Sequence, residues 1–204
     1  ITTLAGKTDS ASSVSYSTIQ DTHAILNHAD NENTISNKNL IISDAVSLST
    51  ANTIKGKTSG TLTFNKVTDT YEELNTKTSV RAGTSSENII GKVVVVSNGV
   101  SISNAETMEA LVTLNNGQAI AGSSFTYNNV EDSASNIATG QTASGQAADI
   151  TDKTIVVSGA ASLDHLHTIR TRAGNGGSVT IIDLYRKKTV ETCVRSDRLS
   201  NTSI

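Results

Sequence analysis

Histidines are the first residues in this chain whose chemistry deserves testing, because imidazole can bind metals and transfer protons. His165 and His167 lie two apart beside Asp164. Residues two apart on a helix point to different faces, whereas a metal site needs ligands that converge. We therefore interpret this pair as solvent-exposed helix residues. His23 and His28 have no matching copies elsewhere in the chain, and we interpret them in the same way.

Three aspartates recur in the same setting, each followed by Thr or Ser: Asp21, Asp69 and Asp132. An Asp followed about five residues later by Leu or Ile is typical of a helix N-cap, so we expect each one to cap a short helix. The alternative is that these carboxylates bind calcium together with turn carbonyls. The Gly-Gly-x-Gly-x-Asp turn of calcium-binding repeats is absent. We predict no metal site and no cofactor, with calcium as the only one left open.

Catalytic constellations are not supported by the sequence. Serine is so abundant that some Ser must lie near some His, and such proximity alone does not define a Ser-His-Asp set. Glu72 and Glu73 are adjacent and would diverge on a helix, unlike the paired carboxylates of a glycosidase. A phosphate-binding Gly-x-x-x-x-Gly-Lys-Ser/Thr loop is also missing. We predict that the protein is not an enzyme.

The aspartates belong to a segment that repeats along the chain. It starts at Ser13, Thr61 and Ser124, and a decayed copy starts at Ser178. A second type of segment alternates with it, of the form Val-Val-Ser-x-x-x-Ser-Leu. Its copies start at Ile41, Val95 and Val156. The strict alternation of two segment types indicates a repeat protein rather than coincidence.

Each segment predicts a strand followed by a helix. In the first type, Leu62, Phe64 and Val67 alternate with polar residues as a half-buried strand requires. In the second type, an apolar strand precedes Ser101 as the N-cap, and Ile102, Ala105, Met108 and Val112 follow at helical spacing. The corresponding helix near the end of the chain would bury Leu163, Leu166 and Ile169.

Short strand–helix units imply parallel strands joined by right-handed crossovers. We predict an α/β repeat solenoid, with parallel strands on one face and short helices and turns on the other. The alternative is an all-β parallel solenoid. The whole of 1–204 would be a single array with half-repeats at approximately 13–39, 40–60, 61–92, 93–123, 124–153 and 154–177, and 178–204 would be a decayed last repeat and C-terminal cap or tail.

These alternating motifs resemble repeats of very long bacterial surface or secreted proteins, notably cyanobacterial and marine ones, that are described as hemolysin-like or adhesin-like. The resemblance covers roughly residues 13–184 and rests on moderately specific motifs. The last copy departs from the pattern, because Arg186 and Lys187 stand where the Asp-Thr pair should be. The resemblance implies leucine-rich-repeat-like β-α units in an extracellular array, and it implies no catalytic residues.

Composition and charge agree with an extracellular or cell-surface location. Ser, Thr and Asn make up roughly a third of the 204 residues, and the formal net charge is −3. Nothing in that charge favours nucleic acid as a partner, and no apolar run is long enough for membrane insertion. Cys193 is the only cysteine, so an internal disulfide framework is excluded.

The tail has a charge of its own. From Asp164 to Ile204 there are seven basic and four acidic residues, which gives a net charge of +3. We expect this end to contact the acidic remainder of another copy or an adjoining repeat. The basic side chains at and after the missing Asp-Thr pair are the candidate interaction residues: Arg186, Lys187, Lys188, Arg195 and Arg198.

The sequence thus predicts a structural or adhesive segment of an extracellular bacterial surface protein or filament. The alternative is a surface-, glycan- or receptor-binding module, such as a phage fibre or an ice-binding-like solenoid. The regular Ser/Thr rows at Thr61/Thr63, Ser124/Thr126 and Ser178/Thr180 motivate that alternative. We favour the interpretation that these hydroxyls solubilise an exposed sheet face.

Overall fold

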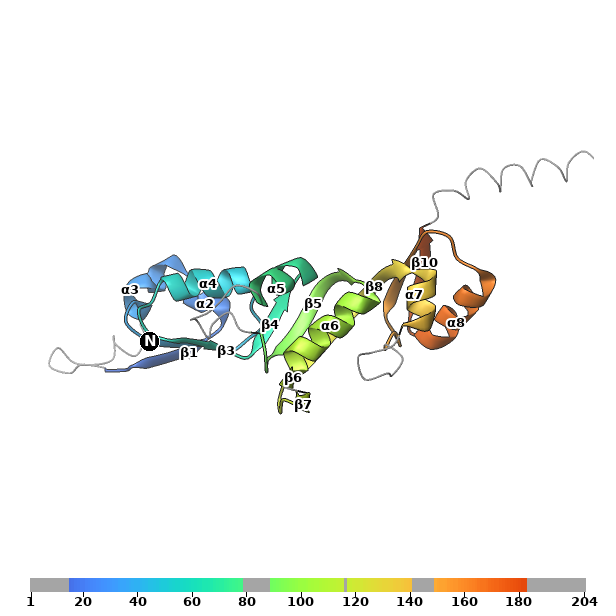
Figure 1. Cartoon of the computed structure of the whole chain (residues 1–204). Helices are drawn as coiled ribbons and strands as arrows, with labels where there is room; N and C mark the ends of the chain where they lie inside the picture. Colours follow the sequence, from blue (N-terminus) through green and yellow to red (C-terminus); the bar gives the residue numbers. More distant parts are fainter. Residues whose placement is uncertain (1–14, 79–88, 116, 141–148, 183–204) are drawn as a thin grey trace, which may run out of the picture. The chain divides into compact units, whose positions relative to one another are not determined.

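The computed structural model describes residues 15–78, 89–115, 117–140 and 149–182 (Figure 1). The chain divides into two compact units. The first comprises Ile1–Val96 and Leu111–Thr126, and the second comprises Ser97–Ala110 and Tyr127–Ile204. The candidate tail residues Arg186, Lys187, Lys188, Arg195 and Arg198, and also Cys193, lie outside the described residues.

The first unit contains a three-stranded parallel sheet in the order β1-β2-β3. Its strands are β1 (Thr18–Asp21), β2 (Asn39–Ile42) and β3 (Leu62–Phe64). Between them lie α2 (His23–Leu26), the 3-10 helix η1 (Ala29–Asn31), α3 (Glu32–Ile35) and α4 (Leu48–Gly56), all on the same side of the sheet (Figure 1). β4 (Lys66–Asp69) and α5 (Tyr71–Thr78) follow.

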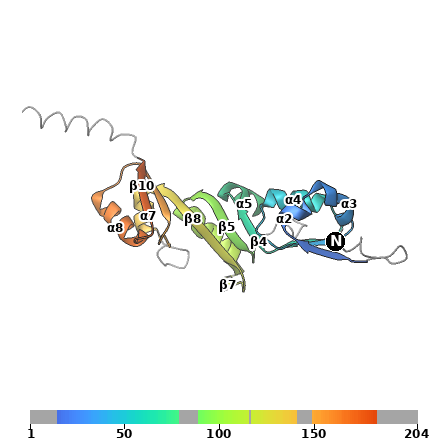
Figure 2. The same ribbon diagram turned by 180° about the vertical axis from the view of Figure 1, so that it is seen from behind.

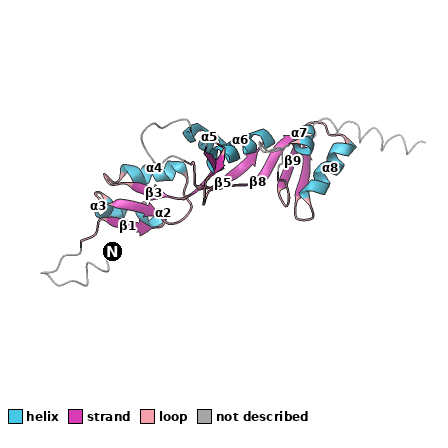
Figure 3. Ribbon diagram, turned by 60° about the horizontal axis from the view of Figure 1, so that its bottom comes forward, coloured by secondary structure: helices cyan, strands magenta, loops and turns pink. Residues whose placement is uncertain are grey.

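A second parallel sheet has the strand order β10-β9-β8-β5-β4. It adds β5 (Val93–Val100), β8 (Ser124–Ser133), β9 (Thr154–Ser158) and β10 (Ser178–Ile182) to β4. Figure 2 shows β5 and β8 side by side. The remaining helices are α6 (Ile102–Thr113), α7 (Ala134–Thr139) and α8 (Leu163–Ala173); α7 packs on α8 (Figure 3). β6 (Leu114–Asn115) and β7 (Gln118–Ala119) form a short antiparallel pair.

The prediction of an α/β repeat solenoid is wrong, and so is its all-β alternative. The described residues form a mixed α/β structure with two separate parallel sheets instead of one continuous array. The ladder breaks at Asn65, because Leu62–Phe64 pairs with β2 whereas Lys66–Asp69 pairs with β5. Helices after most strands contradict the all-β version.

The core follows the predicted helical spacing in α6 and only in part in α8. Leu48, Ala51 and Ile54 of α4 are buried, and so are the four predicted residues of α6. These apolar side chains pack against the inward-facing strand residues. Their removal from water is the main favourable contribution to folding. In α8, Ile169 is buried, but Leu163 is 81% exposed because no described element covers the start of that helix.

Candidate functional site

Asp69 lies at the carboxyl end of β4 and joins two helices. Its Oδ2 accepts a hydrogen bond from the backbone N–H of Leu48, the first residue of α4, at 3.0 Å. Its Oδ1 accepts the N–H of the next residue, Thr70, also at 3.0 Å. The first N–H groups of a helix have no partner within the helix, and they carry partial positive charge. The carboxylate of Asp69 therefore stabilises the start of a helix that begins 21 residues earlier in the chain.

Asp132 repeats this arrangement in the second unit. Its Oδ2 accepts the N–H of Ile102, the first residue of α6, at 3.1 Å. Its Oδ1 accepts the N–H of Ser133 at 2.7 Å and the side-chain amide of Asn136 at 2.8 Å. Asp21 forms only the contact with the next residue: its Oδ1 accepts the N–H of Thr22 at 2.8 Å.

The aspartates do not cap the helices that we expected them to cap. The N-cap of α7 is the hydroxyl of Ser133, which accepts the N–H of Asn136 at 3.2 Å. The hydroxyl of Thr70 likewise accepts the N–H of Glu73 at 3.3 Å. Ser is as good an N-cap as Asp, and Thr is also among the preferred N-cap residues. This leaves the preceding carboxylate free to bind the helix of an earlier segment.

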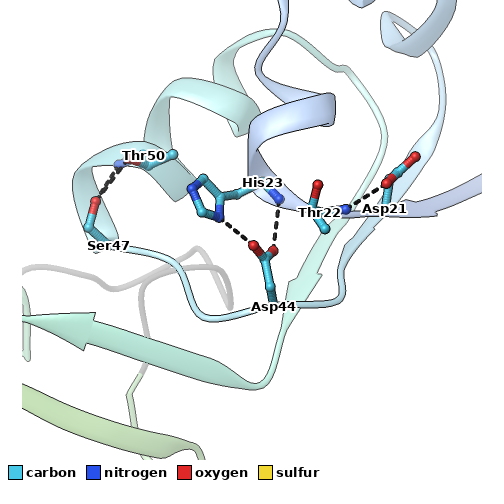
Figure 4. Close-up of polar contacts among 6 residues, drawn as sticks. All are labelled: Asp21, Thr22, His23, Asp44, Ser47 and Thr50. Carbon is cyan, nitrogen blue, oxygen red and sulfur yellow. Dashed lines mark hydrogen bonds and ion pairs between the residues drawn. The ribbon is translucent and has the colours of Figure 1, made fainter.

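His23 and Asp44 form a hydrogen-bonded pair in the first unit, and Figure 4 shows them facing each other. His23 is the first residue of α2, and Asp44 lies in the loop between β2 and α4. One oxygen of Asp44 accepts the backbone N–H of His23 at 2.8 Å, and the other lies 2.7 Å from its Nδ1. Both side chains are partly exposed.

The pKa of Asp44 lies below its ordinary value. Burial acts to raise this pKa, but the hydrogen bonds from the backbone and ring of His23 outweigh burial, because they stabilise the ionised carboxylate. Ser47, also drawn in Figure 4, donates its hydroxyl hydrogen bond to Thr50 Oγ1 at 2.9 Å and caps α4. That hydroxyl is thereby committed to the helix start. The arrangement resembles a nucleophile–histidine–carboxylate set only in its residue types.

Three lysines repeat a contact that the sequence analysis missed. Lys92 Nζ lies 4.5 Å from the ring centre of Phe64 and donates to the carbonyl of Phe64 at 2.8 Å. Lys153 Nζ lies 4.5 Å from the ring centre of Tyr127 and donates to the carbonyl of Tyr127 at 3.0 Å. Lys38 Nζ lies 4.7 Å from the ring centre of Tyr16. The sequence does contain a signal for this contact, because a lysine directly precedes each apolar strand of the second type.

Burial changes the acid–base behaviour of two of these groups. It lowers the pKa of Lys92, because burial disfavours the charged ammonium. It also raises the pKa of Tyr127 to about 12, and the negative charges of Asp149, Glu109 and Glu106 add to that effect. These lysine–aromatic contacts hold neighbouring strands together and leave little of either side chain for a ligand.

The calcium candidates are not brought together. Asp21 lies on β1, Asp69 on β4 and Asp132 on β8, and each binds backbone amides. His28 is exposed and lies 3.5 Å from Asp30. The backbone N–H of His165 donates to the N-cap Ser162. Within the described ranges, no three or more His, Cys, Asp or Glu residues gather as a metal-binding group.

The described helices include none that is long and apolar enough to cross a membrane. Comparison with known proteins returns no matching family model, no matching curated protein and no matching solved structure.

Proposed function

We propose that this chain is a structural or adhesive segment of an extracellular bacterial surface protein or filament, and that it has no catalytic activity. The main support is how its acidic side chains are used. Ligand sites of parallel α/β proteins usually lie beyond the carboxyl ends of the strands. Here the carboxylates at those ends, Asp69 and Asp132, bind helix N-termini instead.

The composition supports the proposed location. The chain is rich in Ser, Thr and Asn and has a single cysteine. The hydroxyl side chains that alternate with the inward-facing residues are exposed, including Thr61 and Thr63 and also Ser124 and Thr126. Exposed hydroxyls keep a sheet face soluble without large charge. We propose neighbouring copies or adjoining repeats of the same protein as the partners.

Sedimentation velocity over a wide concentration range, combined with a binding assay on bacterial cells, tests this proposal. We expect reversible association with rising concentration or saturable attachment to the cell surface. A chain that stays monomeric and attaches to no cells would contradict it.

The exposed hydroxyl rows favour one second candidate, a module that binds glycans or an ordered surface such as ice. Glycan arrays and an ice-recrystallisation assay test this candidate. A specific glycan signal that is lost when Thr61 and Thr63 are both changed to Lys would favour it over the structural role.

A further inference from the structure

Asp21 has one carboxylate oxygen to which no described residue donates a hydrogen bond; the other accepts the N–H of the next residue (Figure 4). Elsewhere such an oxygen binds a helix start. Asp44, after β2, binds the first N–H of α2, which follows the paired strand β1. Asp132, at the end of β8, binds the first N–H of α6, which follows the paired strand β5. The free oxygen of Asp21 is therefore placed for a donor that follows a strand on the open side of β1.

That side of β1 is an unpaired strand edge. Among the described strands, β1 pairs with β2 alone. The carbonyls of Ser17 and Asp21 accept hydrogen bonds from the chain around β2. Because the backbone groups of successive strand residues point to opposite sides, those of Thr18 and Gln20 face away from β2. These are the N–H and C=O groups to which a further parallel strand would bind.

A pocket of about 250 Å³ lies beside this open edge. Ile19, Ile25, Leu26 and Ile35 form its apolar wall, and Asp21 lines it as well. Three of these apolar residues belong to the buried core, whereas Ile25 is 49% exposed. The core of the first unit is therefore open beside β1, where the side chains of a further strand would pack.

The second sheet ends in a matching way at β10. Among the described strands, β10 pairs with β9 alone. The N–H of Ser178 donates to the carbonyl of Lys153, next to β9, so the backbone groups of Val179 and Ile181 face away from β9. Ile181 lies opposite the fully buried Val157, yet it is 43% exposed. The apolar side of the sheet that Val157 occupies is therefore uncovered at β10.

The two edges complement each other in direction and in charge. In both sheets the strand order follows the chain order, so each new strand lies on the same side of the one before. β1 is therefore open on the first side and β10 on the last side, as parallel head-to-tail pairing requires. Residues 18–35 include three acidic residues and no Lys or Arg, whereas residues 164–204 have a net charge of +3. Opposite charges favour the encounter of these two ends.

We propose that β10 of one copy adds as a parallel strand to β1 of a second copy. Main-chain hydrogen bonds supply affinity in this mode of association. Asp21 then accepts a donor from the segment after β10, and the sequence there supplies Arg186, Lys187 and Lys188. The contact joins two different surfaces, so every added copy leaves one edge of each kind open and the copies form a chain. This inference rests on the proposed structural role and names the surface through which copies associate.

Sedimentation velocity of the full chain and of edge variants tests this contact. Gln20→Pro removes an N–H from the open side of β1, where an edge strand tolerates proline. Gln20→Ala keeps that N–H and is the matched control. Ile181→Pro removes an N–H from the open side of β10, with Ile181→Val as its control. We expect wild type and both controls to associate as the concentration rises, and each proline variant to stay monomeric.

A mixture of the two proline variants gives the sharpest result. Gln20→Pro retains an intact β10 edge, and Ile181→Pro retains an intact β1 edge. An equimolar mixture should therefore form a 1:1 dimer and no longer species, which also shows that both variants are folded. Asp21→Asn in the otherwise intact chain should weaken association about tenfold, because it removes a charge-assisted hydrogen bond.

Three results would overturn the proposal: association of either proline variant at the wild-type concentration, a mixture that gives anything other than the 1:1 dimer, or equal association of wild type and Asp21→Asn. A wild-type chain that stays monomeric but attaches to bacterial cells would overturn it as well, while the proposed structural or adhesive role would stand. A chain that neither associates nor attaches to cells would contradict both.

Discussion

Replacing Asp69 by Ala removes two backbone contacts at once. The carboxylate accepts the N–H of Leu48 and that of Thr70, each at 3.0 Å. Loss of a side chain that caps a helix start costs about 1 kcal/mol for a partly exposed site, and Asp69 is partly exposed. Counting each amide as one such contact, we expect Asp69→Ala to lower the free energy of unfolding by about 2 kcal/mol.

Asp69→Asn should cost about half as much. The amide keeps one acceptor oxygen, but its NH₂ group then faces one of the two N–H donors. Asp30→Asn is the matched control, because the Asp30 side chain is 88% exposed. Its free energy of unfolding should change by less than about 0.5 kcal/mol.

Urea denaturation followed by far-UV circular dichroism measures these differences. Amide hydrogen exchange locates them, since protection should fall first at Leu48 and Thr70. If Asp69→Ala unfolds at the same urea concentration as Asp30→Asn, and exchange at Leu48 is unchanged, the carboxylate does not hold the start of α4. The long-range role given to Asp69 and Asp132 would then be wrong.

Three further predictions concern other contacts. The folded-state pKa of Asp44 lies below its ordinary value of 3.8, so the pairing of Asp44 with His23 stabilises the fold above pH 3.8. This stabilisation is lost as the pH falls through the folded-state pKa of Asp44. The melting temperatures of wild type and Asp44→Asn should therefore differ at neutral pH and converge in acid. Lys153→Met should lower the free energy of unfolding by about 1–2 kcal/mol, because it removes both the ring contact and the carbonyl contact at Tyr127, and urea titration measures it. Ile54→Ala empties a fully buried position and should cost about 2–5 kcal/mol in the same assay.

The local elements could be predicted from the sequence because repetition and periodicity are local signals. The copy starting at Thr61 predicts a strand, and β3 and β4 occupy Leu62–Phe64 and Lys66–Asp69. The spacing of Ile102, Ala105, Met108 and Val112 predicts the buried side of α6. Which strands pair with each other could not be predicted. Residue types around Asn65 do not reveal that the chain leaves one sheet there and joins another.

The candidate site escaped prediction for a related reason. An Asp before Thr or Ser has a sufficient local explanation as an N-cap, and that explanation assigns both oxygens to one helix. Parallel pairing instead brings the carboxyl end of a strand beside the start of an earlier helix, so Asp69 reaches Leu48 and Asp132 reaches Ile102. Asp44 binds the start of α2 by the same geometry, although it belongs to the other segment type.

The Asp-Thr and Asp-Ser pairs are therefore better interpreted as two separate devices. At Asp69-Thr70 and Asp132-Ser133, the hydroxyl caps the helix that follows, and the carboxylate joins that segment to an earlier helix. A lost carboxylate should then weaken the contact between segments while leaving the local helix intact. Arg186 and Lys187 replace this pair in the last copy. We therefore expect α8 to gain no such carboxylate from that copy, which agrees with the exposure of Leu163 at its first position.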